Sequence, residues 1–298
     1  MLYTRKTEDD FAKDPAVAEF AGKWFLYHSV WDEKNRLGIG IAVSDDGEDF
    51  EYLGSLPPVL DCEKNGIGAP GAIVHNGRVH LFYQTYGNGK LDAICHAVSD
   101  DGVNFERVGS SEIFAPREPF CKLPYWSCGR AIDADVCIHN GKLILYFATR
   151  DKEMKRQIVG AAYADVTPGL DAAFTLFPEI ILEPTLDWER DCIVAPAALE
   201  LNGRVYLFYA GSYNCAPQQI GSAVSDDGFR FRRLFTEKPF LSCGKTGEWN
   251  ASESGHPYVY KAADGRIWLY YQGSPDGGKN WYISRLGIVS EDGIPVLK

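Results

Sequence analysis

Two aspartates and one histidine are the residues of this chain whose types and spacing best fit proton-transfer chemistry. Asp14, Asp133 and His256 each stand about eight residues before the glycine of a predicted turn, where two further copies of the pattern have Ala69 and Ala195. Carboxylates that gather at one place repel one another and lose water, which separates their pKa values as acid–base chemistry requires. The sequence therefore predicts that Asp14 and Asp133 act together.

Glu253 is the third candidate acid. It lies in the segment 249–257, and the matching position in the preceding copy of the pattern is a cysteine. Because Glu253 is not part of the repeat, we interpret it as a catalytic carboxyl group that is shielded from water and stays protonated near neutral pH. Glu189 and Asp191, in the corresponding loop of the preceding copy, are the alternatives.

The elements that must position these residues are five β-hairpins. Runs rich in β-branched and aromatic residues flank a tight turn five times, and Asn-Gly or Asp-Gly supplies the positive φ angles of that turn in four of them. The turn glycines are Gly22, Gly77, Gly141, Gly203 and Gly265. Their period of 55 to 64 residues is typical of a four-stranded blade with long loops, so the sequence predicts an all-β, five-bladed β-propeller.

The repeat covers almost the whole chain, and no linker or low-complexity segment interrupts it. We therefore predict a single domain, residues 1–298, with four antiparallel strands in each blade. The predicted blades span residues 11–60, 61–115, 116–180, 181–240 and 241–298.

Features that recur in several blades are interpreted as structural. Ser-Asp-Asp-Gly occurs at 44–47, 99–102 and 225–228, with a looser copy at 290–293. Aspartate in such turns bonds to its own backbone, so we assign these pairs to the turns between the outer strands. Tryptophan also recurs ahead of three inner strands, at Trp126, Trp188 and Trp249, and this recurrence favours a structural role.

The composition argues against several classes of function. The net charge of −11 disfavours nucleic acid, whose phosphates need a basic surface. No apolar run reaches the roughly 18 residues of a membrane span, and the start of the chain has no signal-peptide pattern. The eight cysteines contain no Cys-x-x-Cys pair that would indicate zinc. We expect free thiols in the reducing cytoplasm, with secretion as the alternative if a leader has been removed, and neither a metal nor a cofactor.

Two short motifs resemble glycoside hydrolase family 43, whose five-bladed relatives include families 32, 62, 117 and 130. Lys-Asp-Pro-Ala-Val at residues 13–17 resembles the opening of that family, where the aspartate before proline is the general base that activates water. Ile-Asp-Ala-Asp-Val at residues 132–136 resembles its second motif, with alanine in place of proline. There the aspartate orients the general acid and tunes its pKa.

The resemblance implies an inverting, exo-acting glycosidase for short pentose- or hexose-containing oligosaccharides, similar to arabinofuranosidases and xylosidases. Asp14 would then be the base, Asp133 would hold the acid, and Glu253 would protonate the leaving oxygen. Base and acid would lie roughly 6.5–9.5 Å apart. The predicted substrate-binding residues are His256, Arg130, Trp126 and Trp31.

Blade four departs from the family pattern. Family 43 carries its general acid there as Glu-x-Pro, whereas this chain has Val194-Ala195-Pro196. The acid has then moved to Glu253, or His256 takes the role as a histidine does in family 117. Loss of the acid would leave a non-catalytic binding propeller, because a fold alone does not determine function. The other alternative is a phosphorylase like family 130, in which Arg130 and His256 would help to hold phosphate.

Overall fold

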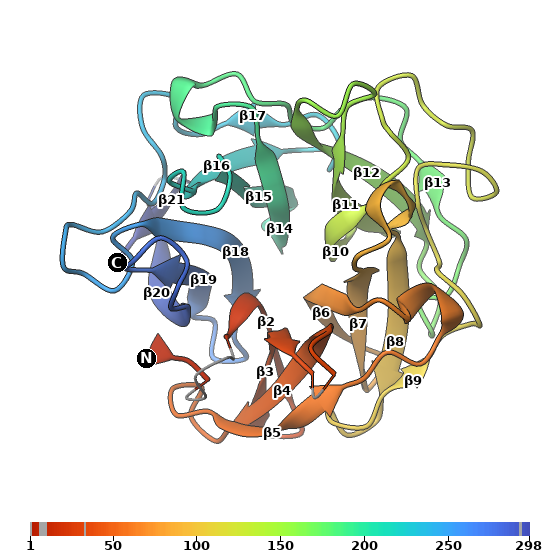
Figure 1. Ribbon diagram of the computed structural model, residues 1–298, viewed down its shortest axis with the longest axis horizontal. Helices are drawn as coiled ribbons and strands as arrows, with labels where there is room; N and C mark the ends of the chain where they lie inside the picture. The colour runs from red at the N-terminus through yellow and green to blue at the C-terminus, as the bar shows by residue number, and fades with distance from the viewer. Residues whose placement is uncertain (1, 6–10, 33, 292–293) are drawn as a thin grey trace.

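The computed structural model describes residues 2–5, 11–32, 34–291 and 294–298 as five antiparallel sheets around one axis (Figure 1). The prediction of an all-β, five-bladed propeller is confirmed. Blade one consists of β2 (Lys13–Phe20), β3 (Lys23–Trp31), β4 (Leu37–Ser44) and β5 (Glu51–Leu56). Blade two consists of β6 (Ile67–His75), β7 (Arg78–Thr85), β8 (Ile94–Ser99) and β9 (Glu106–Arg107). Blade three consists of β10 (Ile132–His139), β11 (Lys142–Arg150), β12 (Gln157–Asp165) and β13 (Thr175–Leu176). Blade four consists of β14 (Ile193–Leu201), β15 (Arg204–Gly211), β16 (Gln219–Ser225) and β17 (Arg232–Arg233).

The last blade keeps the predicted four positions, and two strands share the outermost one. From the axis outwards it contains β18 (Glu253–Lys261), β19 (Ile267–Ser274) and β20 (Tyr282–Glu291). The outer edge of β20 pairs with both β21 (Ile294–Leu297) and β1 (Leu2–Tyr3). Strands from both ends of the chain therefore complete one sheet, which closes the ring (Figure 1). The hairpin pattern could not reveal β1, because it is only two residues long.

Helical structure in the described part of the chain is limited to three 3₁₀ turns, η1 (Asp61–Glu63), η2 (Gly89–Leu91) and η3 (Asp187–Glu189). The three Asn-Gly hairpins turn as predicted, whereas at Asp264-Gly265 only the glycine has a positive φ and residues 262–266 form a longer loop between β18 and β19. At Asn76-Gly77, Asn140-Gly141 and Asn202-Gly203 both residues have φ between 48° and 78°, as a two-residue turn between twisted strands requires.

A β-bulge recurs near the start of every inner strand and determines which residue faces the axis. The pairing of the first two strands shifts register at this point in all five blades. The bulged residues have positive φ values, from 43° at His256 to 54° at Asp14. Since positive φ is uncommon outside glycine, this shared conformation shows that the five positions are structurally equivalent. They are Asp14, Ala69, Asp133, Ala195 and His256.

The second strands supply the largest buried side chains between blades. One tyrosine of each is fully buried, and two of them bond to the Ser-Asp-Asp-Gly turn of the next blade. The Tyr27 hydroxyl donates to the Gly102 carbonyl at 2.9 Å, and the Tyr146 hydroxyl to that of Gly228 at 2.7 Å. The five tyrosines are Tyr27, Tyr83, Tyr146, Tyr209 and Tyr270.

The three Ser-Asp-Asp-Gly turns follow the third strand of their blades, and therefore lie at the end opposite to the bulges. In the first turn, the Asp46 carboxylate accepts hydrogen bonds from the backbone N–H groups of Glu48 and Asp49. These bonds lower the pKa of Asp46 to about 2. The looser copy at 290–293 extends into residues 292–293, which lie outside the described ones.

Candidate active site

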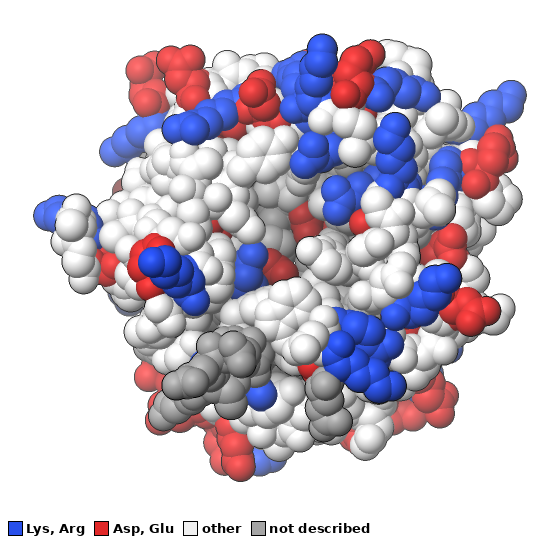
Figure 2. All heavy atoms as spheres, viewed as in Figure 1, with Lys and Arg blue, Asp and Glu red and all other residues white. Residues whose placement is uncertain are grey.

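The bulged ends of the inner strands open into a pocket of about 710 Å³ on the propeller axis. Figure 2 shows it as a hollow at the centre of one face. All five blades contribute to its wall, with Asp14, Tyr86, Asp133, Tyr213 and His256 as one residue from each. Its volume lies within the range of small-molecule sites. None of the paired aspartates of the Ser-Asp-Asp-Gly turns lines it.

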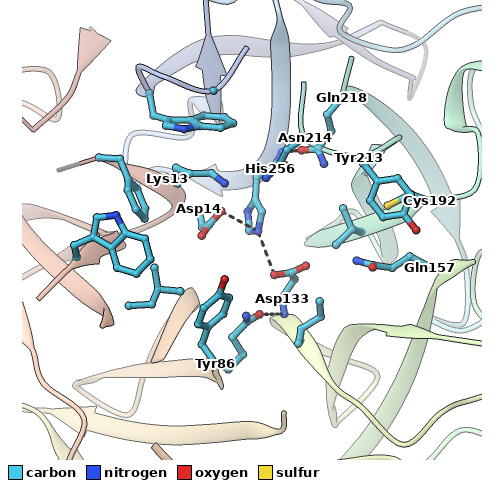
Figure 3. A pocket seen from close by; sticks show the side chains of 18 of the residues that line it. Lys13, Asp14, Tyr86, Asp133, Gln157, Cys192, Tyr213, Asn214, Gln218 and His256 are labelled. Carbon is cyan, nitrogen blue, oxygen red and sulfur yellow. Dashed lines mark hydrogen bonds and ion pairs between the residues drawn. The ribbon is translucent and has the colours of Figure 1, made fainter. Parts of the chain in front are cut away.

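His256 lies between Asp14 and Asp133 inside this pocket (Figure 3). Its Nε2 atom is 3.4 Å from Oδ1 of Asp14 and 3.4 Å from Oδ1 of Asp133. The two carboxylate oxygens are therefore at most twice that distance apart. The side chains of Asp14, Asp133 and His256 are 13%, 10% and 14% exposed, so they are screened from bulk water but open to a ligand.

Asp14 and His256 shift each other's pKa in opposite directions. Burial alone would raise the pKa of Asp14, but the charges of His256 and Lys13 and a hydrogen bond from Ser29 hold it below 3.8. Burial alone would lower the pKa of His256, but the neighbouring Asp14 and Asp133 carboxylates raise it above 6.5. The contact therefore favours the ionised form of Asp14 and the protonated form of His256.

A glutamine from the preceding blade holds each of these three residues by its backbone. The amide oxygens of Gln272, Gln84 and Gln218 accept hydrogen bonds from the N–H groups of Asp14 (3.0 Å), Asp133 (2.8 Å) and His256 (3.1 Å), respectively. A bulge leaves an N–H group outside the strand ladder, and each glutamine satisfies one. Sequence reasoning missed these glutamines, although Gln84 and Gln272 both pair with the residue directly before a bulge.

Glu253 lies behind the pocket wall and does not line it. The residue is fully buried; its Oε1 accepts a bond from Gln272 Nε2 at 2.6 Å and its Oε2 one from the Cys215 N–H at 2.6 Å. Burial raises the pKa of its carboxyl group, while the hydrogen bonds from Gln272 and Cys215 and the charge of Lys13 limit this rise. The structure nevertheless does not bring this group to the position of a general acid, because the Gln272 side chain lies between Glu253 and the bulge at Asp14.

The alternative acid Glu189 belongs to a structural cluster. Its carboxylate accepts hydrogen bonds from the Tyr209 hydroxyl at 2.7 Å and from Arg233 Nε at 2.8 Å, and it is fully buried. The other alternative in this loop, Asp191, is exposed and does not line the pocket. Neither residue faces Asp14.

Blade two contains the same cluster. Glu63 accepts hydrogen bonds from the Tyr83 hydroxyl at 2.6 Å and from Arg107 Nε at 2.9 Å. We call each cluster a Glu-Tyr-Arg clamp. The two clamps have identical sequence spacing, with tyrosine 20 and arginine 44 residues after glutamate. This spacing could have identified Glu189 as part of the repeat.

Three predicted substrate-binding residues have different outcomes. Trp31 lines the pocket, is 39% exposed and packs edge-on against Phe11. Arg130 also lines it, with its Nε 3.4 Å from Oδ2 of Asp92. Trp126 does not line the pocket, which corrects the prediction for this residue. It is buried in the core of blade three and donates from Nε1 to the Pro178 carbonyl at 2.8 Å.

Sequence reasoning missed several residues of the pocket wall. Tyr86 lies nine residues after its hairpin glycine, as Trp31 does, and this spacing was a usable signal. Lys13 and Trp281 come from blades one and five, with the Lys13 ammonium 4.2 Å from the ring centroid of Trp281. Tyr213 is the aromatic residue of the corresponding loop in blade four.

Within the described residues, no group of three or more histidine, cysteine, aspartate or glutamate side chains is arranged to hold a metal ion. All eight cysteines are free thiols. The described residues include no helix with the length and apolar character needed to cross a membrane.

Comparisons with known proteins place the fold among glycosidases. No family model and no curated protein matches the sequence. Among solved structures, a thermostable family 43 glycoside hydrolase matches with a TM-score of 0.76 and 20% identity, over 99% of this chain and 96% of that one. An endo-1,4-β-xylanase from Bacteroides thetaiotaomicron matches at 0.75 and 19%, over 96% and 94%. An α-L-arabinofuranosidase from Lactobacillus brevis matches at 0.71 and 19%, over 95% and 93%. This chain therefore shares the five-bladed fold of family 43 glycoside hydrolases.

Proposed function

We propose that this protein is a glycosidase in which Asp14 is the general base, His256 is the general acid and Asp133 orients His256. The observation that carries this proposal is geometric: inside one axial pocket, Nε2 of His256 lies 3.4 Å from a carboxylate oxygen of Asp14 and 3.4 Å from one of Asp133. The opposite directions of the pKa shifts of Asp14 and His256 support it. Residues whose surroundings separate their pKa values in this way fit the two halves of acid–base catalysis. The fold shared with glycoside hydrolases supports the same reaction class.

The proton inventory of hydrolysis fits these groups. The ionised Asp14 takes a proton from the attacking water, and the protonated His256 gives one to the glycosidic oxygen that leaves. The Asp133 carboxylate accepts the Nε2–H of His256 and keeps the imidazole charged until transfer. Acid and base act on opposite sides of the scissile bond, roughly 6.5–9.5 Å apart in an inverting enzyme. Asp14 and His256 are 3.4 Å apart, so this contact must open for a substrate to enter between them.

The shape of the pocket favours release of sugars from the end of a chain. Walls from all five blades surround the Asp14–His256 pair, whereas cleavage inside a long chain needs a groove open at both sides. Trp31 and Trp281 offer apolar faces on which a sugar ring can pack. We therefore propose an exo-acting, inverting enzyme for short oligosaccharides, in the manner of arabinofuranosidases and xylosidases.

A glycoside phosphorylase is the second candidate. Lys13, Arg130 and Lys279 line the same pocket together with the protonated His256. Such a group of cations could hold inorganic phosphate as the attacking group in place of water.

A panel of nitrophenyl glycosides, assayed with and without inorganic phosphate, tests both candidates. We expect release of nitrophenol without phosphate from at least one pentoside or hexoside, and proton NMR should show the inverted anomer as the first product. Turnover only with phosphate would favour the phosphorylase. Sugar binding in calorimetry without turnover would favour a non-catalytic carbohydrate-binding propeller and overturn the proposal.

A His256→Gln variant tests the assignment of the acid. Activity of the wild-type enzyme should fall as the pH rises through the raised pKa of His256, because the acid loses its proton. The variant should lose this alkaline limb, and it should hydrolyse nitrophenyl glycosides far better than unactivated disaccharides, since a good leaving group needs little protonation. Equal loss on both substrates would exclude His256 as the acid.

A further inference from the structure

Glu253 connects two parts of the pocket that are far apart in the sequence. Its Oε1 accepts a hydrogen bond from Gln272 Nε2, and the Gln272 oxygen in turn accepts the N–H of Asp14. Its Oε2 accepts the backbone N–H of Cys215. One carboxylate therefore reaches the bulge of the proposed base through a single side chain, and bonds directly to the loop between β15 and β16.

The carboxylate determines which way the Gln272 amide points. A carboxylate only accepts hydrogen bonds, so it selects the NH₂ group of Gln272 and leaves the oxygen to face the Asp14 N–H. With the amide reversed, two donors would face each other at Asp14, and an unmade bond at a buried group costs about 1–3 kcal/mol. The orientation of Gln272 thus depends on the acceptor behind it.

Comparison with Gln218 shows why a carboxylate is needed at this one place. Gln218, which holds His256, is oriented by the Ser212 carbonyl, which accepts its Nε2–H at 3.1 Å. A carbonyl is sufficient there because it serves one side chain. Glu253 must accept two N–H groups on separate oxygens, from Gln272 and from Cys215.

The Cys215 bond anchors a wall of the pocket. Cys215 follows directly on Tyr213 and Asn214, which line the pocket, and has a φ of 55° that a non-glycine residue seldom adopts. A backbone held in such a conformation depends on its surroundings. The Glu253 carboxylate is the partner of this N–H, and so it fixes the loop that presents the two side chains.

We propose that Glu253 is a positioning residue that couples the general base to the Tyr213–Asn214 wall, through Gln272 on one side and Cys215 on the other. The inference rests on the glycosidase function proposed above. Glu253 makes no contact with the pocket space itself. Its role is therefore distinct from that of the general acid that the sequence suggested.

The decisive variants are Glu253→Gln and Gln272→Ala. Glu253→Gln keeps the shape of the side chain but offers one acceptor and one donor to two N–H groups, so one bond is lost. We expect kcat to fall about tenfold to a hundredfold, as for other residues that orient catalytic groups, with a rise in KM from the released wall. Gln272→Ala should lower kcat similarly and leave KM near the wild-type value, because it breaks only the link to Asp14.

Leaving-group dependence separates positioning from acid catalysis. For Glu253→Gln the loss should be equal on nitrophenyl glycosides and on unactivated disaccharides. The matched control is Glu189→Gln, a second fully buried glutamate outside the pocket, which should lower the melting temperature but leave kcat and KM unchanged in the folded enzyme. A loss confined to unactivated substrates, or unaltered kinetics of Glu253→Gln, would overturn the proposal.

Hydrogen exchange of the backbone gives a readout that does not need turnover. Amides at Asp14 and Cys215 should exchange faster in Glu253→Gln than in the wild type, and at the wild-type rate in Glu189→Gln. Unaltered exchange rates at both amides would rule out the positioning role, even if the enzyme is active. Faster exchange in a protein that hydrolyses no glycoside would instead uphold the coupling and reject the proposed function.

Discussion

Blades two and four differ from blades one, three and five in where they place their buried charges. Blades two and four have alanine at the axial bulge, Ala69 and Ala195, and each has a Glu-Tyr-Arg clamp. The other three blades have Asp14, Asp133 and His256 at the bulge. Polar residues at the axial bulge and Glu-Tyr-Arg clamps thus occur in different blades.

The comparison shows that burial alone does not identify a catalytic acid. Glu189 and Glu253 are both fully buried. Glu189 directly follows a tryptophan in the sequence, and Glu253 comes four residues after one. Arginine neutralises Glu189 and holds it in the scaffold, whereas Glu253 accepts hydrogen bonds from Gln272 and Cys215, which support the pocket. The partner of a buried carboxylate, rather than its exposure, indicates its role.

The largest effect should follow from removing the charge at the axis of blade one. We expect Asp14→Asn to lower kcat by about 10²–10⁴-fold, as for loss of a general base, with an unchanged melting temperature. The control is Asp46→Asn, in the outer turn of the same blade, which should keep full activity. Retention of more than about a tenth of the wild-type kcat in Asp14→Asn would contradict the assignment.

For a clamp residue we expect a loss of stability without a loss of activity. Arg107→Met leaves Glu63 buried without its cation and should lower the free energy of unfolding by about 3–5 kcal/mol, with kcat unchanged at a temperature where the variant is folded. Urea denaturation measures the loss. In the double variant Glu63→Leu/Arg107→Met no charge stays buried, so much of the stability should return. A lowered kcat in the folded single variant would contradict the claim that the clamps have only a structural role.

The clamp also predicts a pH dependence of stability. Burial alone would raise the pKa of Glu63, but its hydrogen bonds to Arg107 and Tyr83 hold it below 4.5. The folded state therefore gains stability from this group above pH 4.5 and loses it as the pH falls through the lowered pKa. The acid-induced loss should be smaller in the double variant than in the wild type, as measured by denaturation at several pH values.

A smaller effect should separate blade two from blade four. Blade two has the buried pair His80 and His96, whose Nδ1 and Nε2 atoms are 3.0 Å apart, where blade four has Tyr206 and Ser222. Burial lowers the pKa of His80 from 6.5 to about 4 and also lowers that of His96. As the pH falls below 6.5 the unfolded chain binds protons that the folded state does not, so stability falls by about 1.4 kcal/mol per pH unit for each histidine.

The residues of blade four supply the matched variant for this test. His80→Tyr/His96→Ser should show a flatter decline of unfolding free energy between pH 6.5 and 4 than the wild type. An equally steep decline in both proteins would show that other groups cause the acid sensitivity.

The smallest effect is expected at the aromatic wall. Trp31→Ala should raise KM about threefold to tenfold, the equivalent of one aromatic contact, and leave kcat unchanged. Trp126→Phe, which affects the core of blade three, should leave KM unchanged. An unaltered KM for Trp31→Ala would exclude Trp31 from substrate binding.

Several features could be predicted because they depend on local spacing. The hairpin glycines repeat at a nearly constant interval, so the number of blades follows from the sequence. The same interval aligns Asp14, Asp133 and His256 with Ala69 and Ala195, and the structure confirms the equivalence through the shared bulge. The clamps could have been predicted in the same way, because glutamate, tyrosine and arginine have the same sequence spacing in both blades.

The sequence by itself thus determined the five-bladed architecture and the three polar positions at the axis, because strand, turn and bulge are local events that repeat. Only the tertiary structure decided what each buried carboxylate meets. Closure of the ring brings Gln272 of blade five to the backbone of Asp14 in blade one, 258 residues away in the chain. That contact places Glu253 behind the base rather than opposite it. No local sequence pattern predicts the contact between Gln272 and Asp14, because it arises from the packing of the first blade against the last.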